Sequence, residues 1–132
     1  MVVPQRPKRI VSTDRTTNVE VDVTGEQSLD AMESLLVDAA SGLGMYVSHV
    51  TVLGTRRYPG NRHWHLKQDP RARGCLDVTY WPDGPQLWIS MRTSEPDWVH
   101  ESGAQLAFDL ARRLAAHDAA TGQLEGERRD GE

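Results

Sequence analysis

Residues 62–92 read RHWHLKQDPRARGCLDVTYWPDGPQLWISMR, and three segments of this stretch alternate between apolar and polar side chains. An alternation with a period of two is typical of strands that bury one face. We therefore predict strands over residues 62–67, 75–81 and 86–92, with a loop at 68–73 and a turn at 82–85. Strands that follow one another through such short connections form an antiparallel meander.

The rest of the sequence supplies two more strands and two helices. Valines alternate with polar residues over 19–23, and a further strand is predicted over 46–55, before a turn at Pro59-Gly60. Apolar residues at helical spacing predict helices over 26–41, between a Thr24 N-cap and a Gly42 C-cap, and over 97–117, after a Ser94 N-cap. The predicted fold class is α+β, in the order β-α-β-β-β-β-α, with both helices packed on one face of an antiparallel meander sheet.

Composition narrows the class of protein. The chain has 132 residues, 38% of them hydrophobic, a net charge of -4 and one cysteine. We expect a single domain over residues 10–120, between a flexible tail at 1–9 and a disordered tail at 121–132. Cys75 has no partner for an intrachain disulfide, no apolar leader follows Met1 and no stretch is long enough to span a membrane, so we expect a cytoplasmic protein. The acidic balance argues against duplex DNA as a partner.

One face of the predicted sheet has no helix to cover it. Strand alternation turns Trp64 toward the helices and His63 and His65 away from them. Closing the first hairpin at Tyr58 and Asn61 would bring Arg56 beside His63. With the later strands in the matching register, the outward face comprises Arg56, His63, His65, Lys67, Asp77, Thr79, Trp81, Trp88, Ser90 and Arg92.

The leading hypothesis from these residues is a small ligand- or protein-binding module, of an accessory or immunity-like kind. Trp81 and Trp88 could stack against a planar ligand while nearby cations neutralise its negative charge. We therefore expect a small anionic or aromatic ligand, or a protein partner, on this face. Single-stranded nucleic acid and a homodimer that buries the two tryptophans sheet against sheet are further alternatives.

An enzyme is the second hypothesis. His65 opposite Asp77 is an arrangement suited to acid-base chemistry on an anionic substrate, because the carboxylate fixes the tautomer of the imidazole and raises its basicity. His63, His65 and Asp77 also form a two-histidine-one-carboxylate set that could hold zinc or iron. No cofactor motif is visible, so no cofactor is expected. His49 is interpreted as a packed residue of its strand.

Overall fold

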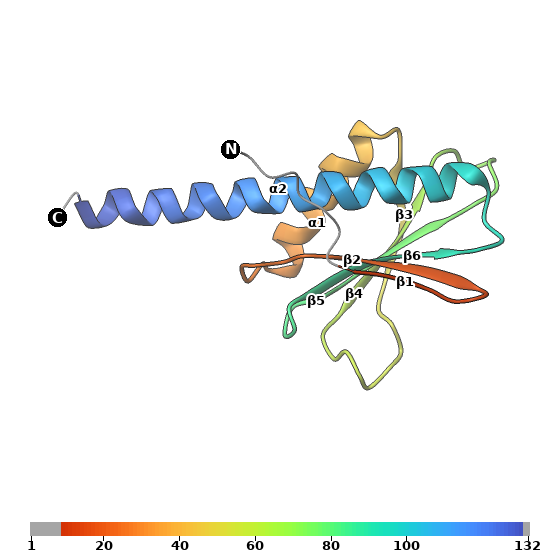
Figure 1. The fold of residues 1–132 in the computed structure, drawn as a ribbon, viewed down its shortest axis with the longest axis horizontal. Coiled ribbons are helices and arrows are strands. Elements are labelled where there is room, and N and C mark those ends of the chain that lie inside the picture. Colours follow the sequence, from red (N-terminus) through yellow and green to blue (C-terminus); the bar gives the residue numbers. More distant parts are fainter. Residues whose placement is uncertain (1–8, 131–132) are drawn as a thin grey trace.

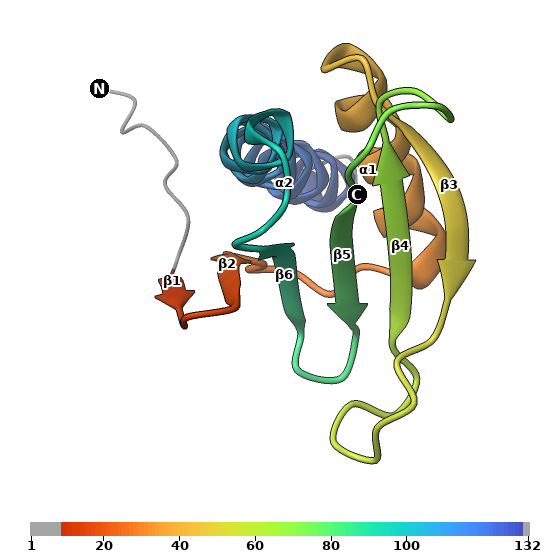
Figure 2. The same ribbon diagram turned by 90° about the vertical axis from the view of Figure 1, so that its right-hand side faces the viewer.

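A six-stranded antiparallel sheet forms one layer of the protein and two helices form the other (Figures 1 and 2). The computed structural model describes residues 9–130. Along the chain the elements are β1 (Arg9–Ser12), β2 (Thr16–Val21), α1 (Leu29–Gly42), β3 (Tyr46–Thr51), β4 (Arg62–Lys67), β5 (Leu76–Trp81), β6 (Gln86–Arg92) and α2 (Asp97–Asp130). The strand order in the sheet is β1-β2-β6-β5-β4-β3. The predicted α+β meander is therefore confirmed, with β2 added at the free edge of β6.

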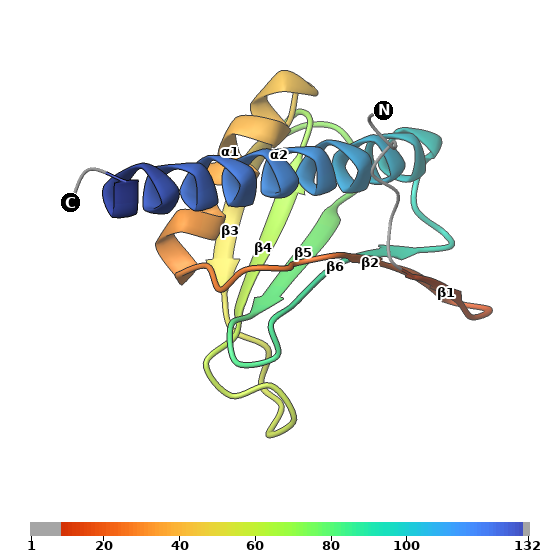
Figure 3. The same ribbon diagram turned by 60° about the vertical axis from the view of Figure 1, so that its left-hand side comes forward.

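Both helices lie on the same face of the sheet, as predicted (Figures 1 and 3). Among the residues whose side chains are described, the core lies between the two layers and contains 21 buried hydrophobic residues. They come from both helices, from β2, β4, β5 and β6, and from Met45 just before β3. Trp64, Leu66 and Val78 of the central strands are fully buried in this core, because strand alternation turns them toward the helices. Among the described residues, no helix combines the length and apolar character needed to cross a membrane.

The predicted pairing of His65 with Asp77 across the central strands is confirmed. Trp64 pairs with Val78, and Val78 pairs in turn with Ile89. On the opposite face His65 therefore pairs with Asp77, as predicted.

The boundaries of α1 differ from the prediction at both ends. Ser28, and not Thr24, is the N-cap, and its hydroxyl accepts a hydrogen bond from the Ala31 amide at 3.0 Å. The helix starts late because the backbone of Gln27 exchanges two hydrogen bonds with the Tyr80 hydroxyl of β5. At the other end Gly42 is still helical, and Gly44 takes the left-handed conformation with φ 75°.

The two ends of the chain also depart from the prediction. The predicted tail at 1–9 lies outside the described residues except for Arg9, which belongs to β1, a short edge strand that the sequence analysis missed. The predicted strand over 19–23 is β2, shifted to Thr16–Val21. α2 begins at Asp97, too late for Ser94 to be its N-cap, and runs past residue 117 to Asp130, into the segment expected to be a tail.

β3 is shorter than predicted, and this changes the neighbours of the histidines. Residues 52–61 form a loop, which the buried Asn61 side chain holds by hydrogen bonds to the Leu53 amide (2.9 Å), the Leu53 carbonyl (3.2 Å) and the Tyr58 carbonyl (2.8 Å). His63 therefore pairs with Thr51, and the predicted position of Arg56 beside it is wrong. The expected turn through Pro59-Gly60 is present, with φ 79° at Gly60.

Candidate functional site

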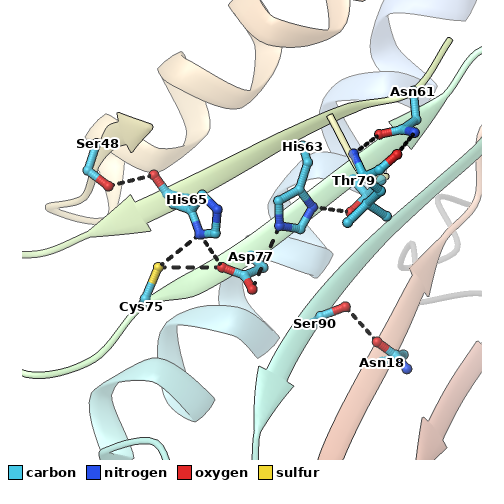
Figure 4. A network of polar contacts seen from close by, with 10 residues as sticks. Asn18, Ser48, Asn61, His63, His65, Cys75, Asp77, Thr79 and Ser90 are labelled. Carbon is cyan, nitrogen blue, oxygen red and sulfur yellow. Dashed lines mark hydrogen bonds and ion pairs between the residues drawn. The ribbon is translucent and has the colours of Figure 1, made fainter. Parts of the chain in front are cut away.

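The side chains on the outward face are joined in pairs across neighbouring strands (Figure 4). His63 on β4 bonds Thr79 on β5, and His65 bonds Asp77 two residues further along the same two strands. These are the register partners, because antiparallel pairing brings directly opposed side chains on one face into contact. The sheet itself therefore builds the site.

His65, Asp77 and Cys75 form one polar cluster. The Nδ1 atom of His65 lies 2.8 Å from Oδ1 of Asp77, so an Nδ1–H donates to the carboxylate. The Cys75 Sγ atom, just before β5, lies 3.4 Å from the same oxygen and 3.5 Å from Nδ1. His65 and Asp77 each keep about a third of their side chains exposed. The cluster is thus reachable from solvent.

His63 is the buried member of the site, with only 7% of its surface exposed. Its Nδ1 atom lies 2.6 Å from Oγ1 of Thr79, which is itself buried. Its Nε2 atom faces Oδ2 of Asp77 at 3.8 Å, beyond ordinary hydrogen-bond range. Both imidazoles therefore direct a nitrogen at the same carboxylate, as Figure 4 shows.

The surroundings shift the pKa values of Asp77 and Cys75 in opposite directions. Burial favours the neutral form of Asp77, but the facing His63, the charge of His65 and the contact with Cys75 outweigh burial and lower the pKa of Asp77. Burial and the negative charge of Asp77 raise the pKa of Cys75 from 9.0 to about 12. Asp77 is thus an anion at neutral pH, while Cys75 is a neutral thiol and a poor nucleophile.

Ser90 is placed on the outward face, as predicted, but its hydroxyl is engaged elsewhere. It donates to the Asn18 side chain on β2 at 2.6 Å. Ser90 is therefore not bonded to His65, and the two residues do not form the pair of a serine hydrolase.

His49 is a site residue that the sequence analysis placed wrongly. A β-bulge between Val47 and His49 shifts the register, so His49 pairs with His65 instead of facing the core. Its ring is exposed and lies edge-on to that of His65, with centroids 6.2 Å apart. The β-bulge is what places His49 beside His65, and no pattern of residues in the strand predicts that bulge.

The two outward tryptophans lie under the loop between β3 and β4. The Tyr58 ring contacts Trp81 (5.3 Å between centroids) and Trp88 (4.9 Å), and the Trp81 indole donates to the Pro59 carbonyl at 3.0 Å. The guanidinium of Arg57 lies 5.5 Å from the centre of the Tyr58 ring. Both outward indoles therefore have an internal role, because they contact this loop.

Two pockets flank the Ser90–Asn18 bond on the outward face. The first has a volume of about 310 Å³ and is lined by Thr16, His65, Cys75, Asp77, Ser90, Met91, Arg92 and Glu95. The second has a volume of about 380 Å³ and is lined by Arg9, Val11, Asn18, Glu20, Arg57, Tyr58, Gln86 and Trp88. We call them the histidine pocket and the aromatic pocket.

The predicted site residues thus divide into three groups. His65, Asp77, Ser90 and Arg92 line the histidine pocket, and Trp88 lines the aromatic pocket. His63 and Thr79 lie on the predicted face but are buried, so they act through their neighbours. The exposed Arg56 and the half-buried Lys67 and Trp81 line neither of these two pockets.

No family model, curated protein or solved structure matches the chain. The functional proposal therefore rests on the geometry of the outward face.

Proposed function

We propose that the protein is a small cytoplasmic binding module that holds a planar, anionic small molecule in the aromatic pocket. The observation that carries this proposal is the composition of that pocket, in which Tyr58 and Trp88 share the lining with two arginines, Arg9 and Arg57, against one acid, Glu20. The guanidinium of Arg57 lies over the Tyr58 ring. Aromatic rings stack on planar groups, and guanidinium groups bind carboxylates and phosphates with paired hydrogen bonds.

The size and shape of the pocket also fit a small ligand. Its volume of about 380 Å³ lies within the range of roughly 300–1,000 Å³ found for small-molecule sites. The side chains of Asn18 and Gln86 in its wall offer hydrogen-bond donors and acceptors that would select among planar anions.

The indole groups of the four tryptophans provide a direct test. In a ¹⁵N-resolved NMR titration with naphthalene-2-sulfonate as the probe, we expect the Trp88 indole signal to move most. Trp64, whose indole donates to Glu33 of α1, and Trp98, whose indole donates to Arg73, are internal controls and should stay in place. Equal shifts at all four indoles, or none at millimolar probe, would contradict the proposal.

Two neighbouring arginines give a matched pair of variants. Arg57 lines the aromatic pocket and Arg56 does not, although both are exposed in the same loop. Arg57→Ala should weaken probe binding by about fivefold to fiftyfold, which corresponds to the loss of one charge-assisted contact, while Arg56→Ala should leave it unchanged. Equal losses of probe affinity in both variants would contradict the proposal, because binding would then depend only on the net charge of the protein.

A small enzyme is the second candidate function, and the His65–Asp77 bond of 2.8 Å in the histidine pocket favours it. Arg92 in the wall of that pocket could position an anionic substrate, with His65 as the general base. A screen of chromogenic phosphate and carboxylate esters tests this candidate. Turnover that disappears in His65→Ala would support it, and turnover that persists in that variant would exclude this dyad.

A further inference from the structure

Three side chains on the outward face present ligand atoms for one metal ion. One nitrogen each from His63 and His65 and one oxygen of Asp77 all lie within 4.8 Å of one another. The three residues come from two adjacent strands that the core holds in a fixed register. A rigid backbone of this kind keeps ligands in place without the cost of ordering a loop.

The separations are close to those around a bound transition metal. With bonds of roughly 2.0–2.1 Å, the ligand atoms of a tetrahedral zinc site lie about 3.3 Å apart. His65 Nδ1 lies 2.8 Å from Oδ1 of Asp77 and His63 Nε2 lies 3.8 Å from Oδ2, so these two distances, each to a different carboxylate oxygen, lie on either side of that length. The three ligand atoms, one from each residue, all lie within 4.8 Å of one another. Small side-chain rotations would equalise these separations, with the metal replacing the proton between His65 and Asp77.

A neighbouring residue already orients one of the ligands. In the tautomer whose Nδ1–H donates to Thr79 Oγ1, at 2.6 Å, the lone pair of His63 Nε2 points toward Asp77. Metal-bound histidines regularly donate their second ring nitrogen to such a partner, which fixes both the tautomer and the ring orientation. Because His63 and Thr79 are buried, this orientation is held by packing as well.

We propose that His63, His65 and Asp77 form a zinc site that keeps one coordination position open toward the histidine pocket. Two histidines and one carboxylate are a ligand set that zinc accepts when a water or substrate completes the shell. His65 and Asp77 line that pocket, whereas His63 is buried and is not part of its lining. The open position therefore faces the space of about 310 Å³ in which a fourth ligand fits.

This site is independent of the aromatic pocket, so its test is separate. Purified protein is freed of metal with a chelator and titrated with Zn²⁺ by calorimetry, and with Co²⁺ as a spectroscopic probe whose visible absorption reports coordination number. We expect one ion per chain and a cobalt spectrum of four or five ligands. Absence of binding by the folded protein at 100 micromolar Zn²⁺ would overturn the proposal.

Substitutions of the proposed ligands and of their neighbour Thr79 test where the ion binds. His65→Ala and Asp77→Asn should each weaken Zn²⁺ binding more than a hundredfold, because each removes one of three ligands. Thr79→Val should weaken it about tenfold to hundredfold, as expected for loss of a partner that orients a ligand. His117→Ala is the matched control, since it removes an exposed histidine from α2.

Two results would refute the proposed zinc site. Unchanged zinc affinity in His65→Ala, with circular dichroism showing a native fold, would refute the site. A loss in His117→Ala equal to that in His65→Ala would show adventitious binding to surface histidines and would refute it as well. His65 is a third exposed, so its truncation leaves the core intact and the test interpretable.

Discussion

The thiol of Cys75 should react far more slowly than an ordinary cysteine. Its pKa is raised from 9.0 to about 12, first by burial and then by the negative charge of Asp77. At pH 8 this lowers the thiolate fraction about a thousandfold. A thiolate of higher pKa is also the better nucleophile, by about thirtyfold for this difference. The net expectation is alkylation about thirtyfold slower than in the unfolded chain, before steric hindrance is counted.

The assay follows iodoacetamide alkylation at pH 8 by intact mass, because the chain has one cysteine and each molecule can gain one group. The same protein unfolded in urea gives the reference rate. Asp77→Asn should accelerate the reaction of the folded protein by removing the neighbouring charge, but only in part, because burial remains the larger cause. A folded protein that reacts as fast as the unfolded one would refute the placement of Cys75 in this cluster.

Three further predictions concern stability. Gly103→Ala should lower the free energy of unfolding in urea by about 1–2 kcal/mol, because the added Cβ would lie 2.2 Å from Sδ of Met91. Gly42→Ala is the control and should be neutral or stabilising, because its Cβ would meet no atom within 4 Å. A larger loss of stability in Gly42→Ala than in Gly103→Ala would contradict the packing of α2. Asn61→Ala should lose about 1–3 kcal/mol and raise amide exchange in the 52–61 loop, because three hydrogen bonds disappear. The stability that the Asp77 carboxylate contributes to the folded state is fully present above its ordinary pKa of 3.8 and is lost as pH falls through its lower folded pKa. The melting temperature of Asp77→Asn should therefore depend less on pH below about 3.8 than that of the wild type.

The core-facing side of the sheet and helices was predictable from the sequence, because burying one face of an element gives its apolar residues a regular spacing. Trp64, Val78 and Ile89 had to share a face, and the register that pairs them also brings His65 to Asp77. A shift of two residues would keep the faces and change these partners, so the connections between the strands had to supply the rest. The identity of the central site residues followed without any functional motif. The free edge of the sheet was harder, since β1 has only four exposed residues and no buried face to mark it.

The errors at the start of α1 and the end of β3 arose where a side chain bonds to the backbone of another segment. The Tyr80 hydroxyl, 53 residues away along the chain, holds Gln27 outside α1 and moves the N-cap to Ser28. Asn61 likewise ends β3 early by holding the Leu53 backbone. Neither contact leaves a periodic trace in the sequence, so a local reading of caps and turns assigns the wrong boundary.

The burial of His63 is the feature of the outward face that bears most directly on the proposed zinc site. A polar side chain removed from water costs free energy unless it is bonded, and one contact with Thr79 satisfies only one of its two nitrogens. The second nitrogen faces a carboxylate at a distance too long for a direct hydrogen bond. Among the described residues, no fully buried side-chain nitrogen or oxygen lacks a hydrogen-bond partner, so the burial of His63 does not by itself require a further group. The proposed zinc ion would engage this second nitrogen together with the nitrogen that His65 directs at the same carboxylate.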